Sequence, residues 1–485
     1  MSLVGILVGL GLLVGFAFRG WSVLLLAPIA ALIAALLSGE PLLAHWTQTF
    51  MNSASQFVAQ FFPLFLLGAL FGKLMEDSGS VTAIADLIIR KLGHGRAILA
   101  VVLASALVTY GGVSLFVAFF VIGPMAQGLF RAAGVPRHLM PAAIALGTST
   151  FTMSALPGTP SIQNAIPMPF FGTTPFAAPG LGIVASVIMF GFGMWWLNRA
   201  EAKARHMGQG FHHNNGSTQL NPAESAKIAR ERATTAHEFD PAELDSGQRS
   251  EAAPPVTAAA LPIVVVIAVN MVMSLIILPR LDASFLAEPR WGETSLAAVG
   301  GVWAVITALA CAIVAVLVLN FRRLPKLRET VDAGANASVL PALSVASLVG
   351  FGAVVAEMPA FATVRDWVLG ISGGPLVSLA AATNVLAALT GSASGGLTIA
   401  LDALGSTYLA LARDVGIDPA LLHRVAVIAS GTLDSLPHNG AVVTLLAVCG
   451  STHRESYFDI VMVGIVSAIL ALAAVIVLGS LFGSF

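Results

Sequence analysis

Charge is scarce in this chain. Of its 485 residues, 10% are charged and 57% are hydrophobic, and the mean hydropathy is +0.87. A soluble domain has about 25% charged residues to cover its surface, so the composition excludes a soluble enzyme. The net charge of −1 provides no basic surface for nucleic acid.

Cysteine, phosphate-binding loops and metal-binding clusters are lacking as well. The two cysteines, Cys311 and Cys449, lie in apolar runs and form no metal pattern. The sequence has no nucleotide-binding glycine loop and no paired carboxylates at metal spacing, so we expect no metal, no cofactor and no enzymatic activity. The first residues, MSLVGILVGLGLLVGF, lack the basic start and cleavage site of a signal peptide, which predicts a retained membrane helix.

Long apolar runs are abundant instead. Several contain about 20 residues, the length that crosses a bilayer as a helix, so we predict an all-α, polytopic protein of the inner (plasma) membrane. The expected apolar elements of the first half fall near residues 3–18, 21–39, 57–75, 81–93 (short and amphipathic), 97–131, 138–172 and 175–198. Those of the second half fall near residues 258–278, 295–320, 338–358, 361–370 (short), 373–413, 417–450 and 456–482.

The one long hydrophilic stretch, residues 199–255, separates the two halves. Its charged, Gly and Ser residues predict a flexible linker. Basic loops remain in the cytoplasm, which places this linker and the basic cluster FRRLPKLR (321–328) inside. The same rule places Lys73 and Arg90 of the first half inside. Equivalent spans of the two halves then run in opposite directions, which predicts the inverted-topology repeat of a secondary transporter.

Each half has two polar interruptions, and a single offset aligns both pairs. The stretch YGGVS (110–114) precedes an apolar helix, as TGSASGG (390–396) does 280 residues later. The same offset aligns Ser154 with Asp434. Glycine and proline are common in membrane helices, but their frequency alone does not predict a shared offset. We interpret 110–114 and 390–396 as the tips of two re-entrant helical hairpins.

The second pair of interruptions, residues 148–164 and 430–440, predicts two broken helices. Unpaired backbone groups in hydrocarbon are costly, so such breaks face protein or water. The helix N-termini at the breaks offer N–H groups to a carboxylate, and nearby hydroxyls complete a binding site, although each hydroxyl has the alternative of bonding to its own or a neighbouring helix. The candidate substrate-binding residues are Gly112, Ser114, Thr150, Thr152, Thr159, Ser392, Ser394, Thr432, His438 and Asn439.

Two ionisable residues, Asp434 and His438, lie in the second broken helix. Ionisable groups at membrane depth are costly and usually functional. Histidine titrates near neutral pH, so His438 is a candidate for proton coupling or for binding a carboxylate. Asp434 is a second candidate for the proton. The structural alternative is that Asp434 caps a half-helix and His438 is only a hydrogen-bond donor.

At these residues the sequence resembles the gluconate:proton symporter (GntP) family of the ion transporter superfamily. LPGTPSIQNAIP resembles the first binding loop of that family, and GTLDSLPHNGAVVTLL resembles the second, most closely in the D-3-hydroxybutyrate permease branch. The hairpin tips lack the Ser-Asn-Thr triplets of the sodium-coupled dicarboxylate carriers, which favours protons. The first loop also lacks a histidine near TSTFTMS, a departure from the gluconate carriers.

The resemblance implies a scaffold domain, a mobile transport domain and a homodimer. We expect a first repeat over residues 1–198, a cytoplasmic linker over 199–255 and a second repeat over 256–485. Each repeat then holds scaffold helices, an interfacial helix, a hairpin with a broken helix, and a last membrane helix: 3–75, 81–93, 97–172 and 175–198 in the first, and 258–358, 361–370, 373–450 and 456–482 in the second.

The function expected from the sequence is proton-coupled symport of a small organic monocarboxylate, such as 3-hydroxybutyrate or a gluconate-like hydroxy acid. The partners are the carboxylate, protons and the lipid bilayer. The alternative is a sodium-coupled di- or tricarboxylate transporter of the same superfamily. A channel and a membrane-embedded enzyme are the remaining alternatives, and the sequence offers no nucleophile or metal cluster for the enzyme.

Overall fold

A computed structural model describes residues 2–17, 19, 21–211, 247, 248, 250, 253–437 and 439–485. Within these residues the regular structure is entirely helical, and eight helices are long and apolar enough to cross a membrane. The all-α, polytopic prediction is therefore confirmed. The eight are Leu42–Asp77, Leu115–Ala133, Pro179–His206, Val256–Arg280, Leu296–Arg323, Leu327–Glu357, Ala393–Val415 and His453–Phe482.

The first half runs from α1 to α12, with short 3-10 and π segments labelled η. The elements are α1 (Ser2–Ala17), α2 (Val23–Ser38), α3 (Leu42–Ala44), η1 (His45–Phe50), α4 (Met51–Asp77), α5 (Ser80–Leu92), η2 (His94–Arg96), α6 (Ala97–Tyr110), α7 (Leu115–Ala133), η3 (Arg137–Leu139), α8 (Met140–Thr148), α9 (Phe151–Ser154), α10 (Ile162–Ala165), α11 (Pro167–Phe171) and α12 (Pro179–His206).

The second half runs from α14 to α24. Its elements are α14 (Val256–Val272), η5 (Met273–Ile277), η6 (Leu278–Arg280), η7 (Ser284–Ala287), η8 (Pro289–Trp291), α15 (Leu296–Asn320), η9 (Phe321–Arg323), α16 (Leu327–Ala337), α17 (Val339–Glu357), α18 (Phe361–Leu369), α19 (Gly374–Thr390), α20 (Ala393–Val415), α21 (Pro419–Thr432), α22 (Gly440–Val448), α23 (His453–Ile460), η10 (Val461–Val466) and α24 (Ser467–Phe482).

Two boundaries differ from the sequence-based expectation. Helix α12 continues to His206, past the expected end at residue 198, because the charged residues beyond the apolar run still form a helix in which Arg205 pairs with Glu201 at 2.6 Å. Helix α16 occupies a segment that we expected to be a basic loop. Its buried residues Thr330, Ala333 and Gly334 recur at helical spacing.

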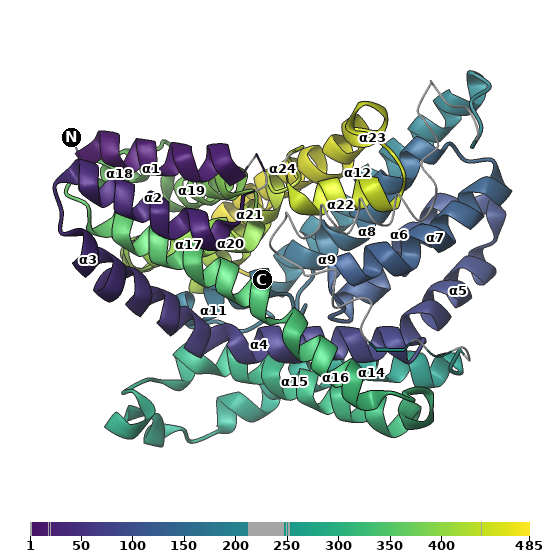
Figure 1. The fold of residues 1–485 in the computed structure, drawn as a ribbon, viewed down its shortest axis with the longest axis horizontal. Coiled ribbons are helices and arrows are strands. Elements are labelled where there is room, and N and C mark those ends of the chain that lie inside the picture. The colour runs from purple at the N-terminus through teal and green to yellow at the C-terminus, as the bar shows by residue number, and fades with distance from the viewer. Residues whose placement is uncertain are drawn as a thin grey trace.

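Helix α4 forms the middle of the molecule (Figure 1). Helices α1, α2, α17 and α18 gather near the N-terminus on the left of the view, α5 to α8 lie on the right, and α14 to α16 lie below. Small residues allow the closest packing. A Cβ atom on Gly5 would lie 2.7 Å from Ala34 O, and one on Gly9 would lie 2.8 Å from Ala30 O, so α1 and α2 touch through their backbones.

Contacts between the halves are reciprocal. Helix α4 packs against α15, and α17 packs against α2. Helix α7 packs against α22, and α20 packs against α11. Helix α4 also contacts α17, and α12 contacts α24. In the repeat predicted from the sequence, the partners in these contacts occupy corresponding places in the two halves.

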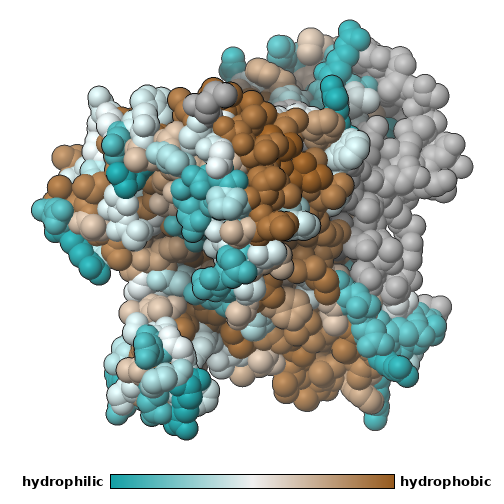
Figure 2. Space-filling model, turned by 60° about the vertical axis from the view of Figure 1, so that its left-hand side comes forward, coloured by the Kyte–Doolittle hydropathy of each residue, from teal (hydrophilic) through white to brown (hydrophobic). Residues whose placement is uncertain are grey.

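Hydrophobic side chains cover a broad region of the surface, with hydrophilic residues gathered at its flanks (Figure 2). Exposed residues such as Val187, Val264 and Val318 belong to the long apolar helices. Such a surface is unusual for a soluble monomer and suits the hydrocarbon core of a bilayer.

Candidate functional site

The turn between α6 and α7 is connected to the first broken helix by a hydrogen bond and by close packing. The turn includes Gly112, whose φ of +95° is in the left-handed region that favours glycine. The Tyr110 hydroxyl donates a hydrogen bond to Pro157 O at 2.8 Å. A Cβ atom on Gly112 would lie 3.1 Å from Cγ of Pro160, so the glycine allows the close approach of these two segments.

The turn between α19 and α20 has its own local bonds. Ser392 caps α20 by accepting a hydrogen bond from Gly395 N at 3.2 Å, and its hydroxyl lies 3.2 Å from that of Ser394. Gly396 sits where α20 meets α19, because a Cβ atom there would lie 2.2 Å from Ala387 N. The two helices therefore pack directly against each other at this turn.

Most hydroxyls of the first broken helix bond to their own backbone. The Thr150 hydroxyl donates to Leu146 O at 2.6 Å, and that of Thr152 donates to Gly147 O at 2.7 Å. Thr432 of the second broken helix likewise donates to Ile428 O at 2.9 Å. Thr159 differs, because its buried hydroxyl has no hydrogen-bond partner among the described residues.

Two fully buried residues of α21, His423 and Arg424, hold the first broken helix in place. His423 Nε2 lies 3.1 Å from Asn164 Oδ1. The Arg424 guanidinium donates to Ala155 O at 3.1 Å and to Ala177 O at 3.1 and 2.6 Å. The arginine bonds thus satisfy the Ala155 carbonyl at the break and the Ala177 carbonyl in the turn before α12.

Asn439 organises the second broken helix. Its Oδ1 atom accepts hydrogen bonds from Ala441 N at 2.7 Å and Val442 N at 3.3 Å, which caps α22. Its Nδ2 atom donates to Gly391 O at 2.8 Å and to Asp434 Oδ1 at 2.8 Å. One side chain thus joins the α19–α20 turn, the break and the start of α22. His438, the neighbouring candidate, lies outside the described residues.

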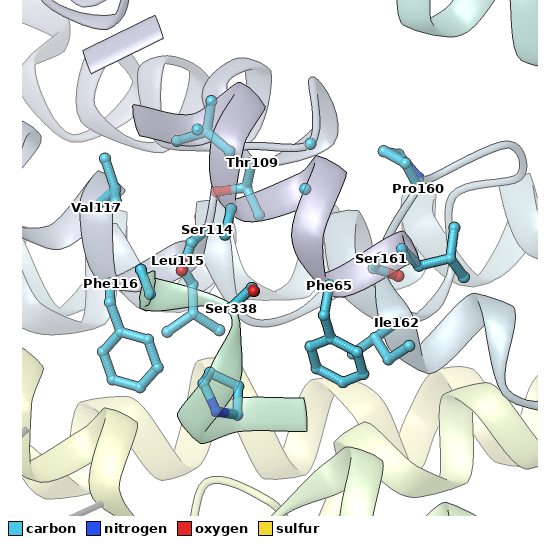
Figure 3. Close-up of a pocket in the computed structure, with 18 of the residues that line it drawn as sticks. Phe65, Thr109, Ser114, Leu115, Phe116, Val117, Pro160, Ser161, Ile162 and Ser338 are labelled. Atoms are coloured by element: carbon cyan, nitrogen blue, oxygen red, sulfur yellow. The ribbon is translucent and has the colours of Figure 1, made fainter. Parts of the chain in front are cut away.

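A cavity of about 230 Å³ lies where these parts meet (Figure 3). It is bounded by one face of α4, the α6–α7 turn, the first broken helix, the junction of α16 with α17, and the start of α20. Its polar and charged lining residues are Lys73, Glu76, Thr109, Ser114, Ser161, Gln163, Ser338 and Ser394.

Five of the predicted site residues line one of two neighbouring cavities. Gly112, Ser114 and Ser394 line the large cavity. Asp434 and Asn439 line a second cavity of about 20 Å³, room for about one water molecule. Three residues line both cavities and connect them: Leu115, Met153 and Gln163. The residues absent from both lining sets are Thr150, Thr152, Thr159, Ser392 and Thr432.

The helix N-termini at this centre differ in how they are capped. Ser392 caps α20 and Asn439 caps α22 with their side chains. Ser114 is the N-cap residue of α7, but its side chain makes no capping hydrogen bond. The first residues of α7, Leu115, Phe116 and Val117, line the large cavity together with Ser114. An uncapped helix N-terminus facing a cavity is suited to bind an anion.

Six of the eight polar and charged lining residues were not among the site residues predicted from the sequence. Lys73 was used only for orientation. The other five were not selected: Glu76, Thr109, Ser161, Gln163 and Ser338. The signal for the charged pair was present, because KLMED at the end of an apolar run places a lysine three and four residues before two acids on one helix face. Among the described residues, no group of His, Cys, Asp and Glu side chains could hold a metal ion.

Residues 1–173 match the GntP family permeases. Over 491 aligned residues the chain is 40% identical to the uncharacterized transporter YxjC of Bacillus subtilis (strain 168), and the match covers 100% of both chains. This chain belongs to the GntP permease family. The permease is thus a multi-pass membrane transporter.

Solved transporters share the fold of the permease at low identity. The YdaH transporter of Alcanivorax borkumensis, described as having an unusual topology, superposes with a TM-score of 0.55 and 16% identity over 91% of this chain and 89% of its own. MtrF of Neisseria gonorrhoeae, described with a class of antimetabolite efflux pumps, gives a TM-score of 0.53 and 15% identity over 91% of this chain and 85% of its own. At these identities the likeness concerns the fold alone.

Proposed function

We propose that the permease carries a small organic monocarboxylate, such as 3-hydroxybutyrate or a gluconate-like hydroxy acid, together with protons across the inner membrane. The observation that carries this proposal is the uncapped N-terminus of α7 at the wall of the large cavity. Its amide groups suit a carboxylate. The cavity of about 230 Å³ is smaller than the ~300–1,000 Å³ of drug-sized ligand sites, which favours a small acid.

Polar side chains around this N-terminus suit the hydroxyl group of the substrate. The Thr109 hydroxyl is buried and has no partner among the described residues. Gln163 lines both cavities and offers an amide between them. We assign Ser114 and Ser394 to the same binding set, because both line the large cavity.

Proton coupling is assigned to the second broken helix. Asp434 lines the small cavity, which shares three lining residues with the large one, so a proton held there lies in the cavity next to the proposed substrate site. His438 remains a candidate on sequence grounds, because it titrates near neutral pH. We assign four hydroxyls to supporting the backbone of the site: those of Thr150, Thr152, Ser392 and Thr432. Thr159, whose hydroxyl has no partner among the described residues, stays a candidate for substrate binding.

Alternating access in this proposal comes from an inverted repeat. The reciprocal contacts of α4 with α15 and α17 with α2, and the matching order of elements, support two halves related by a two-fold axis. In this arrangement the α6–α7 and α19–α20 pairs are re-entrant hairpins, and a dimeric scaffold containing α4 and α17 holds the mobile part. The hydrophilic segment between the halves is cytoplasmic.

The test is uptake of radiolabelled D-3-hydroxybutyrate into proteoliposomes under an inward proton gradient without sodium. We expect accumulation that lactate and gluconate inhibit. Uptake that depends on sodium, or that citrate alone inhibits, would remove the proton and monocarboxylate assignments. A steady conductance without saturation would instead indicate a channel.

The residue assignments are tested in the same assay with two substitutions. Asp434→Asn and His438→Ala are each expected to abolish accumulation driven by the proton gradient. Exchange of internal for external substrate should persist in a variant that has lost only proton coupling. A variant that accumulates substrate like the original protein would show that the replaced residue does not carry the proton.

A further inference from the structure

A buried lysine lies at the wall of the large cavity. Lys73 of α4 is 6% exposed, and among the described lining residues it is the only one with a cationic side chain. The lysine is held by Asp77, four residues later, with 3.0 Å between Nζ and Oδ1. The other oxygen of Asp77 accepts a hydrogen bond from Thr330 of α16 at 2.7 Å. Burying an ammonium group costs desolvation free energy even when the group is paired. The position of Lys73 at the cavity wall therefore points to a function.

The Lys73 ammonium has N–H groups that are free to donate further hydrogen bonds. An ammonium carries three N–H groups, and the distance from Nζ to Glu76 Oε2 is 3.9 Å, beyond hydrogen-bond length. In the part of the chain that the structure describes, the ammonium forms ion pairs with Asp77 and, at the longer distance, with Glu76, and no group accepts a hydrogen bond from it. The ammonium therefore has the capacity to bind a second carboxylate while it keeps Asp77.

The α4 backbone brings this lysine to the uncapped N-terminus of α7. Gly72, next to Lys73, faces the turn before α7, because a Cβ atom there would lie 3.7 Å from Ser114 N. On the other side, Gly334 of α16 packs so closely that a Cβ atom would lie 2.9 Å from Cα of Leu70 and 3.3 Å from Cβ of Lys73. Helix α16 thus packs against the aliphatic stem of Lys73, while Gly72 faces the turn before α7.

We propose that Lys73 is the cationic anchor for the substrate carboxylate. Resting on the proposed transport of organic acids, this assignment adds a residue from α4 to a site otherwise built from the turns and broken helices. The carboxylate binds between the Lys73 ammonium and the first turn of α7, and Asp77 with Thr330 holds the ammonium in position. The site then selects an anion, and a neutral analogue of the same shape binds weakly.

The first experiment compares Lys73→Gln with Asp77→Asn in purified protein and in proteoliposomes. Losing one partner of a buried charge pair weakens binding substantially, so we expect Lys73→Gln to lower the apparent affinity for D-3-hydroxybutyrate on the order of 100-fold. Asp77→Asn keeps a side-chain oxygen that can hold the ammonium and removes a competing negative charge, so this variant should bind the anion at least as tightly as the original protein. Lys91→Gln on α5, an exposed lysine, is the control for the charge change and should have no effect.

Chemical rescue separates lost charge from misfolding. In a background with Cys311→Ser and Cys449→Ala, a Lys73→Cys variant is treated with 2-aminoethyl methanethiosulfonate, which attaches an ammonium, or with the methyl reagent, which does not. We expect the first reagent alone to restore uptake. Equal effects of Lys73→Gln and Asp77→Asn, or equal rescue by both reagents, would make the pair purely structural and overturn the proposal.

A binding measurement tests the role of Lys73 even if the protein does not transport monocarboxylates together with protons. Thermal protection of the purified protein is measured with D-3-hydroxybutyrate, gluconate, citrate and 3-hydroxybutyramide. We expect at least one carboxylate to protect, the amide to fail, and the difference to vanish in Lys73→Gln. Protection by citrate alone would contradict the proposed monocarboxylate while supporting the anchor. Carboxylate protection that persists unchanged in Lys73→Gln would overturn the anchor whatever the transport result.

Discussion

His423 Nε2 lies 3.1 Å from Asn164 Oδ1, and the surrounding bonds determine which atom donates. Asn164 Nδ2 donates to Thr159 O at 3.0 Å and Pro175 O at 3.1 Å, so Oδ1 is the acceptor. His423 Nε2 therefore has the proton, and Nδ1 accepts from the Thr173 hydroxyl at 2.6 Å. A residue of α21 thus connects the first broken helix to the turn after α11.

Replacing this histidine should destabilise the fold. His423→Leu leaves the buried Asn164 Oδ1 without its partner, at a cost of about 1–3 kcal/mol, and removes the acceptor of the partly buried Thr173 hydroxyl. We expect a clearly lower midpoint of thermal unfolding in detergent. His206→Leu at the exposed end of α12 is the control. An unchanged midpoint in His423→Leu would contradict the network.

The two serines that begin α7 and α20 should behave differently on replacement by alanine. Ser392→Ala removes a cap from α20 and should cost about 1 kcal/mol of stability. Ser114→Ala removes no capping bond and should leave stability unchanged while it weakens substrate binding. Thermal unfolding and the apparent KM for uptake are measured for both. Equal losses of stability would show that Ser114 caps its helix like Ser392.

A methyl group at Gly396 should force α19 and α20 apart. In Gly396→Ala the new Cβ atom would lie 2.2 Å from a backbone nitrogen of Ala387, and such overpacking costs about 1–3 kcal/mol or more. Gly191→Ala in α12 is the matched control, because a Cβ atom there meets nothing within 4 Å. We expect the first variant to be poorly folded by size-exclusion profile and thermal melt, and the second to match the original protein. Comparable behaviour of the two would argue against direct contact at this turn.

The bridging role of Asn439 predicts an effect of a nearly isosteric change. Asn439→Asp keeps the oxygen that caps α22 but loses the donor to Gly391 O and places a carboxylate beside Asp434. We expect transport to be lost while the helical content measured by circular dichroism is kept. Asn52→Asp on the exposed start of α4 controls for the added charge. Full transport by Asn439→Asp would show that the bridge is dispensable.

The helices were largely predictable from the sequence, because apolar runs of membrane length are a strong and local signal. Helix α16 was missed, since its few apolar residues are spread among charged ones and the basic cluster before it suggested a loop. The turns at Gly112 and Gly391 were found because glycine marks left-handed backbone. Local pattern therefore identified where the chain breaks.

What the breaks contact was not predictable in the same way. The partners of His423 and Arg424 lie roughly 250 residues away in the sequence, and nothing local indicates that pairing. Lys73 was treated as an orientation signal, because its packing against α16 and its place in the cavity beside α7 arise only in the folded chain. The hydroxyls of Thr150, Thr152 and Thr432 each donate to the carbonyl one turn earlier, a bond that the sequence alone does not distinguish from a bond to substrate.

Two arginines have a consequence for how the chain is made. Arg424 of the second half binds carbonyls of Ala155 and Ala177 in the first, and Arg137 of the first binds those of Cys449 and Gly450 in the second. During synthesis the first half enters the membrane before its partner arginine exists. Its broken helix can then reach its final form only after most of α21 has emerged from the ribosome. Biogenesis of this transporter is therefore a late, joint event of both halves rather than a sequence of two independent insertions.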